Sequence, residues 1–299
     1  MYSDSSLNLK MPWFCCSLNH NLPLYLQILL TSPDDVIVMK CALISPIVFS
    51  MFLHSTLAQT VESYSTAQAH SHNDSRQLRP FTEAYDQQFG SIETDVFLKN
   101  GTLYAVNHEV DATAERTLAK LYLQPISQQL EKNNGMIYVQ NDVYLQLVFD
   151  LITPASESMP LLVKELEKYK NLTESNCTVK IVITGKIPAP ELFDKYPDYI
   201  QFEGSPDIDY TPKQLERVAL IGQSLQKYTG WNGEGPLSKN DKKSISKVVQ
   251  KAHELGKKIR FRDAPDNINT WKTMMALQVD YLDTGKVIQM GDYLRTAPR

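Results

Sequence analysis

The chain has 299 residues, of which 42% are hydrophobic and 21% are charged, and its formal net charge is −4. This balance is typical of a folded globular protein and argues against a disordered chain. Proteins that bind nucleic acid need a basic face toward the phosphate backbone, and the sequence shows none, so we expect no nucleic-acid partner. The length suits one large α/β barrel or two small domains once a leader is removed.

A secretory signal peptide is predicted at residues 39–58. A basic start precedes an apolar run that ends at Leu53, and Thr56 and Ala58 then follow with the small-x-small spacing of a cleavage site. We expect cleavage after Ala58 and a secreted or periplasmic protein. A membrane anchor or a buried helix is the alternative, but the apolar run is shorter than the ~20 residues that a span needs.

The residues before this leader, 1–38, fit neither a leader nor a domain, and we interpret them as an upstream extension of the reading frame that begins naturally at Met39. Residues 59–299 then form the single folded domain. They contain one cysteine, Cys177, so we expect no internal disulfide. No cluster of cysteine and histidine has the spacing of a structural zinc site.

Short apolar runs alternate with amphipathic stretches along residues 59–299. The predicted strands are Ala67–His70, Ser91–Asp95, Leu145–Asp150, Lys180–Thr184, Tyr199–Glu203, Val218–Ile221, Lys258–Phe261 and Tyr281–Asp283. The predicted helices are Phe81–Phe89, Leu118–Asn133, Pro160–Lys170, Ala189–Lys195, Pro212–Ala219, Lys239–Leu255 and Thr270–Gln278. This alternation predicts the α/β class and a single-domain (β/α)₈ TIM barrel. An open doubly wound sheet is the alternative, weakened because no glycine-rich phosphate fingerprint follows the first strand.

Acidic side chains stand at the ends of predicted strands, where TIM barrels carry their sites. Glu93 and Asp95 are two residues apart on one strand, so both point to the same face. Carboxylates this close repel each other unless a cation lies between them, and oxygen ligands favour Mg²⁺ or Ca²⁺. The alternative is an ion pair with a basic residue such as Arg260. Asp150 ends another strand and is the natural third ligand, unless it starts a turn or helix.

Four histidines lie in residues 59–299: His70, His72, His108 and His253. His253 falls within a predicted helix and is expected on the surface, whereas His70 and His108 end apolar runs. A lone histidine at a strand end is usually structural, but two that converge with carboxylates suggest proton transfer. No Gly-x-Ser-x-Gly motif supports a serine hydrolase. A glycosidase would carry its carboxylates on separate strands, unlike Glu93 and Asp95.

Four segments occur in a fixed order along the chain: Ala69-His70-x-x-Asn73, Ile92-Glu93-Thr94-Asp95-Val96, His108 after a short strand, and Leu147-Val148-Phe149-Asp150-Leu151. This ordered set resembles the glycerophosphodiester phosphodiesterase-like superfamily, which also holds phosphatidylinositol-specific phospholipases C and the spider-venom sphingomyelinases D. The resemblance extends in particular to the branch with a His-Ser-His-Asn-Asp signature, which includes the fungal altered inheritance of mitochondria proteins. Segments that begin at Gly230, Arg260 and Val279 also resemble that branch.

The resemblance implies a TIM barrel with a divalent cation, Mg²⁺ or Ca²⁺, held by Glu93, Asp95 and Asp150. It implies that His70 and His108 are the general acid and base. One imidazole deprotonates the attacking hydroxyl, and the other protonates the leaving oxygen. A hydroxyl of the substrate itself can attack first and give a cyclic phosphate.

The sequence departs from the family pattern at three places. Ser71-His72 replaces the usual Arg-Gly after the first histidine, Asn107-His108-Glu109 replaces Gly-His-Asp, and Arg262 stands where the branch tends to have an aromatic residue. These departures do not affect the three predicted metal ligands, but they leave the identity of the substrate open. Substrate or phosphate contacts are expected from His72, Asn73, Trp231 and Arg260. A third acid/base group and a packing residue are the alternatives for His72.

We therefore expect a metal-dependent phosphodiesterase that cleaves a glycerophosphodiester or a phospholipid headgroup. The expected partner is a small phosphodiester or a lipid headgroup, reached by a monomer through transient contact with a membrane surface. A non-catalytic barrel that binds metal and phosphate is the first alternative, and a secreted glycoside hydrolase is the second.

Overall fold

A computed structural model describes residues 63–139 and 143–296. The chain divides into two compact units, Met1–His54 and Ser55–Arg299, and every described residue belongs to the second. The predicted upstream extension and signal peptide therefore lie outside the described residues. Within those residues, no helix combines the length and the apolar character that a membrane crossing requires.

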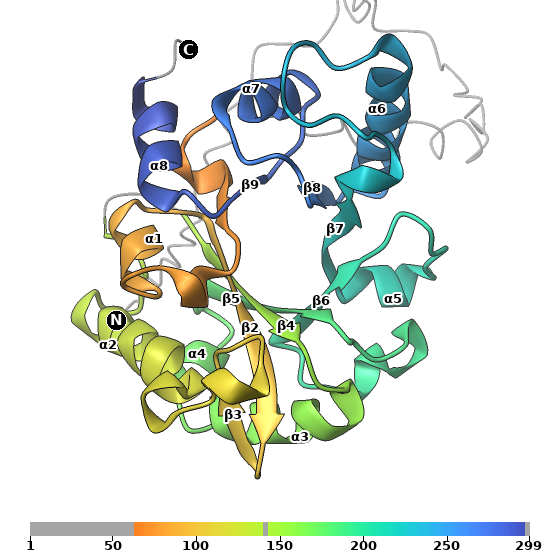
Figure 1. The fold of residues 1–299 in the computed structure, drawn as a ribbon. Coiled ribbons are helices and arrows are strands. Elements are labelled where there is room, and N and C mark those ends of the chain that lie inside the picture. The colour runs from red at the N-terminus through yellow and green to blue at the C-terminus, as the bar shows by residue number, and fades with distance from the viewer. Residues whose placement is uncertain (1–62, 140–142, 297–299) are drawn as a thin grey trace, which may run out of the picture. The chain divides into compact units, whose positions relative to one another are not determined.

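Eight parallel strands form a barrel around a central axis, with helices outside them (Figure 1). Their order is β8-β7-β6-β5-β4-β2-β1-β9, and a bridge between Arg260 and Tyr281 joins β8 to the start of β9. This closure confirms the predicted TIM barrel and excludes the alternative, an open doubly wound sheet. The strands are β1 Ala69–Ser71, β2 Ser91–Lys99, β4 Leu145–Leu151, β5 Val179–Gly185, β6 Ile200–Gly204, β7 Val218–Ser224, β8 Lys258–Arg262 and β9 Leu282–Thr284.

Alternate residues of each strand face the barrel interior or the helix layer. Val148, Val182, Leu220 and Tyr281 form a small apolar cluster of their own, from four different strands or strand ends, which fills the interior. Ile92 and the other outward-facing apolar residues of the strands pack in the large core beneath the helices. Toward the carboxyl-terminal ends of the strands, polar and charged side chains replace the inner apolar ones. The candidate site therefore lies directly above the small apolar cluster.

The helices lie at α1 Thr82–Asp86, α2 Gln124–Lys132, α3 Ala155–Leu166, α4 Lys170–Thr173, α5 Pro212–Glu216, α6 Lys239–Glu254, α7 Ile268–Ala276 and α8 Val287–Thr296. A π-helical turn, Ala119–Leu123, precedes α2, and a 3-10 helix covers Pro190–Lys195. Helix α5 begins with a capping box, in which the Thr211 hydroxyl accepts from the Gln214 backbone amide.

The sequence reasoning missed several elements, and some of its helix boundaries differ from those observed. Helix α8 was not predicted, nor was the short strand β3 Thr102–Tyr104, which pairs antiparallel with β2. Helix α3 starts at Ala155, so Pro160 lies inside it rather than at its first position. Near the start of this helix the Ser158 hydroxyl lies 2.5 Å from the Thr153 hydroxyl.

Candidate active site

Charged side chains from six strands meet at the carboxyl-terminal end of the barrel, which we call the barrel mouth. They lie at inner-facing positions, and register pairs several of them directly, as with Asp95 beside Asp150 and His70 beside Asp283. The barrel mouth comprises His70, Glu93, Asp95, Asp150, Glu203, Arg260, Arg262 and Asp283, together with His72 just beyond β1.

Arg260 lies fully buried at the centre of the barrel mouth. Its Nη2 pairs with Glu93 Oε2 and lies 2.6 Å from Glu203 Oε2, while its Nη1 contacts His70 Nε2 and lies 3.6 Å from Asp283 Oδ1. Burial alone would lower the pKa of this guanidinium, but the surrounding carboxylates raise it. Burial likewise opposes ionisation of Glu93, but the charge of Arg260 holds the pKa of Glu93 well below its usual range. Arg260 is therefore a fixed cation of the site.

His70 is fully buried, and both of its ring nitrogens have protein partners. Nδ1 lies 2.7 Å from Ser91 Oγ, and Nε2 meets the Arg260 guanidinium. A guanidinium can only donate, so Nε2 accepts and the proton resides on Nδ1, which donates to Ser91. In this arrangement the Nε2 of His70 faces the barrel mouth, where it also lies 3.5 Å from Glu93 Oε2 and 3.4 Å from Asp283 Oδ1.

His72 lies at the solvent side of the same cluster, with 32% of its side chain exposed. Its Nδ1 is 2.9 Å from Glu93 Oε1 and 4.0 Å from Asp283 Oδ2. Burial would lower the pKa of His72, but the hydrogen bond to Glu93 and the charges of Asp283 and Glu93 raise it to about 9. The imidazole is thus protonated at neutral pH.

The loop that carries His72 is anchored by a buried carboxyl group. Asp74 accepts hydrogen bonds from Ser71 Oγ at 2.7 Å, from the Phe81 backbone amide at 2.5 Å and from the Tyr122 hydroxyl at 2.8 Å. Asn73 lies between His72 and Asp74 in the left-handed region, with φ of 49°. These contacts tie the segment after β1 to the helix layer and fix where His72 emerges.

Asp95 and Asp150 form the acidic side of the barrel mouth. Asp95 accepts a hydrogen bond from Asn107, but its Oδ2 is buried without a hydrogen-bond partner among the described residues. Burial raises the pKa of Asp150 to about 6, and the negative charges of Glu93 and Asp95 add to this shift. The three carboxyl groups predicted as metal ligands are therefore electrostatic neighbours.

Two glycines leave room for acidic side chains. A Cβ atom at Gly222 would lie 1.4 Å from Glu203 Oε1, and one at Gly185 would lie 2.0 Å from Asp150 Oδ1. Gly185 also has a φ of +78°, which side-chain-bearing residues rarely adopt. Strands β5 and β7 thus carry glycine at the positions where a carboxylate of a neighbouring strand occupies the space of a side chain.

One set of three metal-ligating side chains lies close together at the barrel mouth. Within residues 63–139 and 143–296, His70, His72 and Asp283 have ligand atoms within 4.8 Å of one another. The predicted ligands Glu93, Asp95 and Asp150 do not form such a set within these residues. The ion pair of Glu93 with Arg260, which the sequence left open as an alternative, is present.

The remaining predicted site residues lie around the rim. His108 is exposed and precedes a short 3-10 helix, and its neighbour Asn107 reaches Asp95. Trp231 is half-buried, and its Nε1 donates to the Glu234 carbonyl at 2.8 Å. It lines a cavity of about 510 Å³ between the loops after β7 and β8, together with Asp263 and other residues of those loops.

Sequence reasoning missed three residues of the barrel mouth. Glu203 and Asp283 end the predicted strands Tyr199–Glu203 and Tyr281–Asp283, so the strand-end rule that selected Asp150 would also have selected them. Arg262 was noted as a departure from the family pattern but received no role. It follows Arg260 by two residues and therefore faces the same side of β8.

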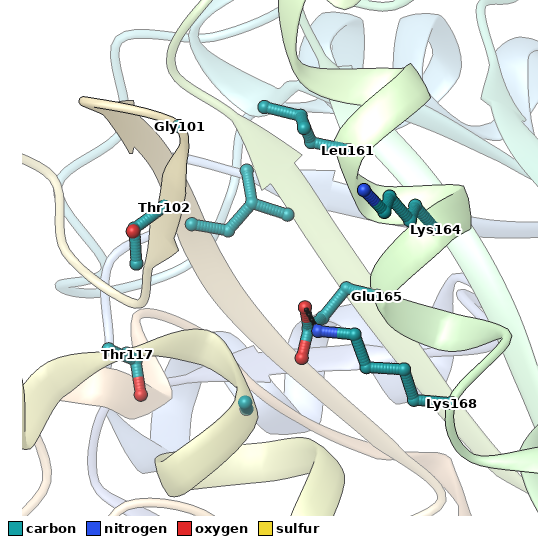
Figure 2. A pocket seen from close by; sticks show the side chains of 9 residues that line it. Gly101, Thr102, Thr117, Leu161, Lys164, Glu165 and Lys168 are labelled. Atoms are coloured by element: carbon teal, nitrogen blue, oxygen red, sulfur yellow. Dashed lines mark hydrogen bonds and ion pairs between the residues drawn. The ribbon is translucent and has the colours of Figure 1, made fainter.

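A separate cavity of about 320 Å³ lies between helix α3 and the turn at Gly101 and Thr102 (Figure 2). An ion pair of its lining joins Lys168 Nζ to Glu165 Oε2 at 2.5 Å. None of the predicted site residues lines it. The barrel mouth is therefore the stronger candidate for chemistry.

Comparison with known proteins confirms the resemblance inferred from the motifs. Residues 59–189 match the family model of the AIM6-like phosphodiesterase domain. The chain is 27% identical to the altered inheritance of mitochondria protein 6 homolog of Arthroderma benhamiae over 66% of this chain and 72% of that protein. It is 26% identical to altered inheritance of mitochondria protein 6 of Eremothecium gossypii, over 72% of this chain and 66% of that protein. The protein of that name from Lachancea thermotolerans is 25% identical over 68% and 57%.

The matched domain covers strands β1 to β5 and thus one side of the barrel mouth. His70, Glu93, Asp95, His108 and Asp150 lie inside it. The arginines and the acidic residues of β6 and β9 lie beyond its end at residue 189. The match to a phosphodiesterase domain therefore covers the half of the site that carries the predicted metal ligands.

Proposed function

We propose that this protein is a metal-dependent phosphodiesterase that cleaves a glycerophosphodiester or a phospholipid headgroup at the barrel mouth. The match to a phosphodiesterase domain supports the reaction class. The observation that carries the proposal is the convergence of buried acidic groups, a buried guanidinium and two histidines at the carboxyl-terminal ends of the strands.

The charge balance of the barrel mouth favours a bound cation. Five carboxyl groups, those of Glu93, Asp95, Asp150, Glu203 and Asp283, face two guanidiniums and one imidazolium. An excess of buried negative charge is costly without a counterion. A divalent cation would reduce this excess.

The chemistry of the donors fits an oxygen-ligated metal. Asp95 and Asp150 would hold it, and the unpartnered Asp95 Oδ2 supports this assignment. Glu93 remains the third predicted ligand, although His72 and Arg260 engage its two oxygens. Mg²⁺ and Ca²⁺ prefer such ligands. Bound there, the cation would hold the phosphate oxygens and neutralise the charge that develops on them.

The proton transfers require a base and an acid near the phosphate. His70 carries its unprotonated Nε2 toward the barrel mouth, which is the form that accepts a proton from an attacking hydroxyl. His108 is exposed on a segment tethered to Asp95 through Asn107, where it can protonate the leaving oxygen. Arg260 would have to release Nε2 of His70 before that nitrogen could act as the base.

A non-catalytic barrel that binds metal and phosphate is the competing proposal. Ser91 and Arg260 contact the two ring nitrogens of His70, so neither nitrogen is free. This observation favours the binding barrel. Secretion, action as a monomer and transient contact with a membrane surface remain parts of our leading proposal. Amino-terminal sequencing of the mature protein tests the predicted start at Met39, and a mature form that begins before Met39 would contradict it.

Phosphorus NMR with a panel of phosphodiesters decides between catalysis and binding. The panel contains glycerophosphocholine, glycerophosphoinositol and lysophospholipids, each with Mg²⁺, with Ca²⁺ and with a chelator. We expect turnover that the chelator abolishes and that His70→Ala or His108→Ala lowers by ~10²–10⁴-fold. Val110→Ala, in the same exposed segment as His108, is the matched control and keeps full activity. Metal-dependent stabilisation without turnover of any substrate would instead establish the binding barrel.

A further inference from the structure

We propose that Arg262 binds the phosphoryl oxygens of the substrate, the role that the sequence analysis expected of Arg260. This inference rests on the proposed phosphodiesterase function and names a residue that sets its substrate affinity. It follows from the different surroundings of two arginines that share one strand face, two residues apart.

Arg260 is enclosed by the protein, although its Nε has no hydrogen-bond partner among the described residues. Its side chain is fully buried, and its two terminal nitrogens contact Glu93, Glu203 and His70. A phosphate could reach this guanidinium only by displacing carboxylates that compensate its buried charge, which is costly. Arg260 is therefore a positioning residue that orders the groups around it.

Arg262 has the opposite character. It is the last residue of β8, about 7 Å farther along the strand toward solvent, and 32% of its side chain is exposed. Its Nη1 lies 3.9 Å from Glu203 Oε1, which is too long for a hydrogen bond. Among the described residues, no side chain or carbonyl accepts a hydrogen bond from this guanidinium. All of its N–H groups are thus available to a ligand.

The position of Arg262 links the buried charges to a cavity that can take the rest of the substrate. In the sheet, Arg262 pairs with Ser224 at the end of β7. Asp263, the next residue, lines the cavity of Trp231. A phosphate on Arg262 therefore lies at the rim, with the cavity beside it for the alcohol group.

The chemistry of the guanidinium suits an anion with several oxygens. Two parallel N–H groups of an arginine can donate to two oxygens of one phosphate, whereas the ammonium of lysine acts as a point charge. The ligand class is therefore a phosphate ester or inorganic phosphate. If Arg262 served only to balance the charge of Glu203, lysine would replace it without loss.

The test measures phosphate binding directly, so that it does not depend on turnover. Isothermal titration with inorganic phosphate and with glycerol 3-phosphate compares wild type, Arg262→Gln, Arg262→Lys and Lys258→Gln at one Mg²⁺ concentration. Lys258 is the exposed first residue of the same strand, at the other end of the barrel, so Lys258→Gln makes the same charge change away from the site. Thermal melting of each variant verifies folding, and KM and kcat are measured with bis(p-nitrophenyl) phosphate.

We expect Arg262→Gln to weaken phosphate binding by about 10- to 100-fold, the worth of a charged hydrogen-bonding partner. Arg262→Lys should lose a substantial part of this affinity, and Lys258→Gln none. KM should rise with the dissociation constant while kcat changes less. Unchanged affinity in a folded Arg262→Gln variant, or an equal loss in Lys258→Gln, would overturn the proposal, as would a wild type that binds neither phosphate ligand.

The same measurements separate this inference from the proposed function. Phosphate binding that depends on Arg262 without turnover of any diester would support the anion site and reject the phosphodiesterase. Turnover with an unchanged KM in Arg262→Gln would support the enzyme and reject the role of Arg262.

Discussion

Gly222 is the position at which a single methyl group should disturb the barrel mouth most. A Cβ there would lie 1.4 Å from Glu203 Oε1 and 2.2 Å from Glu203 Cδ, whereas real contacts of this kind stay beyond 3.0 Å. In Gly222→Ala the Glu203 side chain must therefore leave its place and with it the 2.6 Å contact to Arg260 Nη2. Breaking a buried ion pair from one side costs ~3–5 kcal/mol.

Thermal unfolding measures this cost. A loss of that size should lower the Tm by roughly 6–20 °C in a domain of this length, since each kcal/mol is worth about 2–4 °C. Gly230→Ala is the matched control, because a Cβ at Gly230 meets nothing within 4 Å and its φ lies outside the left-handed region. The effect of Gly222→Ala should also shrink in a Glu203→Gln background, because both changes remove the same contact. Equal melting temperatures for Gly222→Ala and Gly230→Ala would refute the reasoning.

Two other predictions follow from the contacts of His72 and of Asp74. The folded-state pKa of His72, about 9, exceeds the ordinary histidine value of about 6.5, so its stabilisation is complete below pH ~6.5 and is lost as the pH rises through 9. Urea unfolding of wild type should therefore show a decline over this range that His72→Gln lacks, and identical slopes would contradict it. Tyr122→Phe removes the hydroxyl that donates to buried Asp74 and should lower the free energy of unfolding by ~1–3 kcal/mol in the same assay. Tyr85→Phe, at a half-buried hydroxyl 3.2 Å from Gln129, is its control and should cost less than half as much.

The barrel itself was predictable, because each buried strand is a short apolar run bounded by turn residues. All eight predicted strands overlap an observed one, and the expected interior follows from alternation along β2 and β4. The missed helix α8 lies at the end of the chain, where no further strand follows to mark it as a connection. Strand β3 has three residues, too few for a pattern to distinguish it from a loop.

The partners within the barrel mouth were not predictable from the sequence. Strand-end position brought His70, Glu93, Asp95 and Asp150 together because parallel strands share one carboxyl-terminal edge. It could not show which carboxylate faces which cation. That choice depends on side-chain packing across the barrel. Because Gly222 has no side chain, Glu203 has room beside it, and Arg260 lies between two glutamates.

These partners divide the barrel mouth into an arginine side and an acidic side, with Glu93 between them. Glu203 and Asp283 compensate Arg260, whereas Asp95 and Asp150 lack a basic partner at hydrogen-bonding distance among the described residues. The binding of a divalent cation should therefore depend on the acidic side. We expect Mg²⁺ or Ca²⁺ to raise the Tm of wild type and of Glu203→Gln, although Glu203→Gln starts from a lower value. Asp95→Asn and Asp150→Asn should abolish that rise, because each removes an anionic ligand. A metal response that survives in both asparagine variants but disappears in Glu203→Gln would place the cation on the arginine side instead.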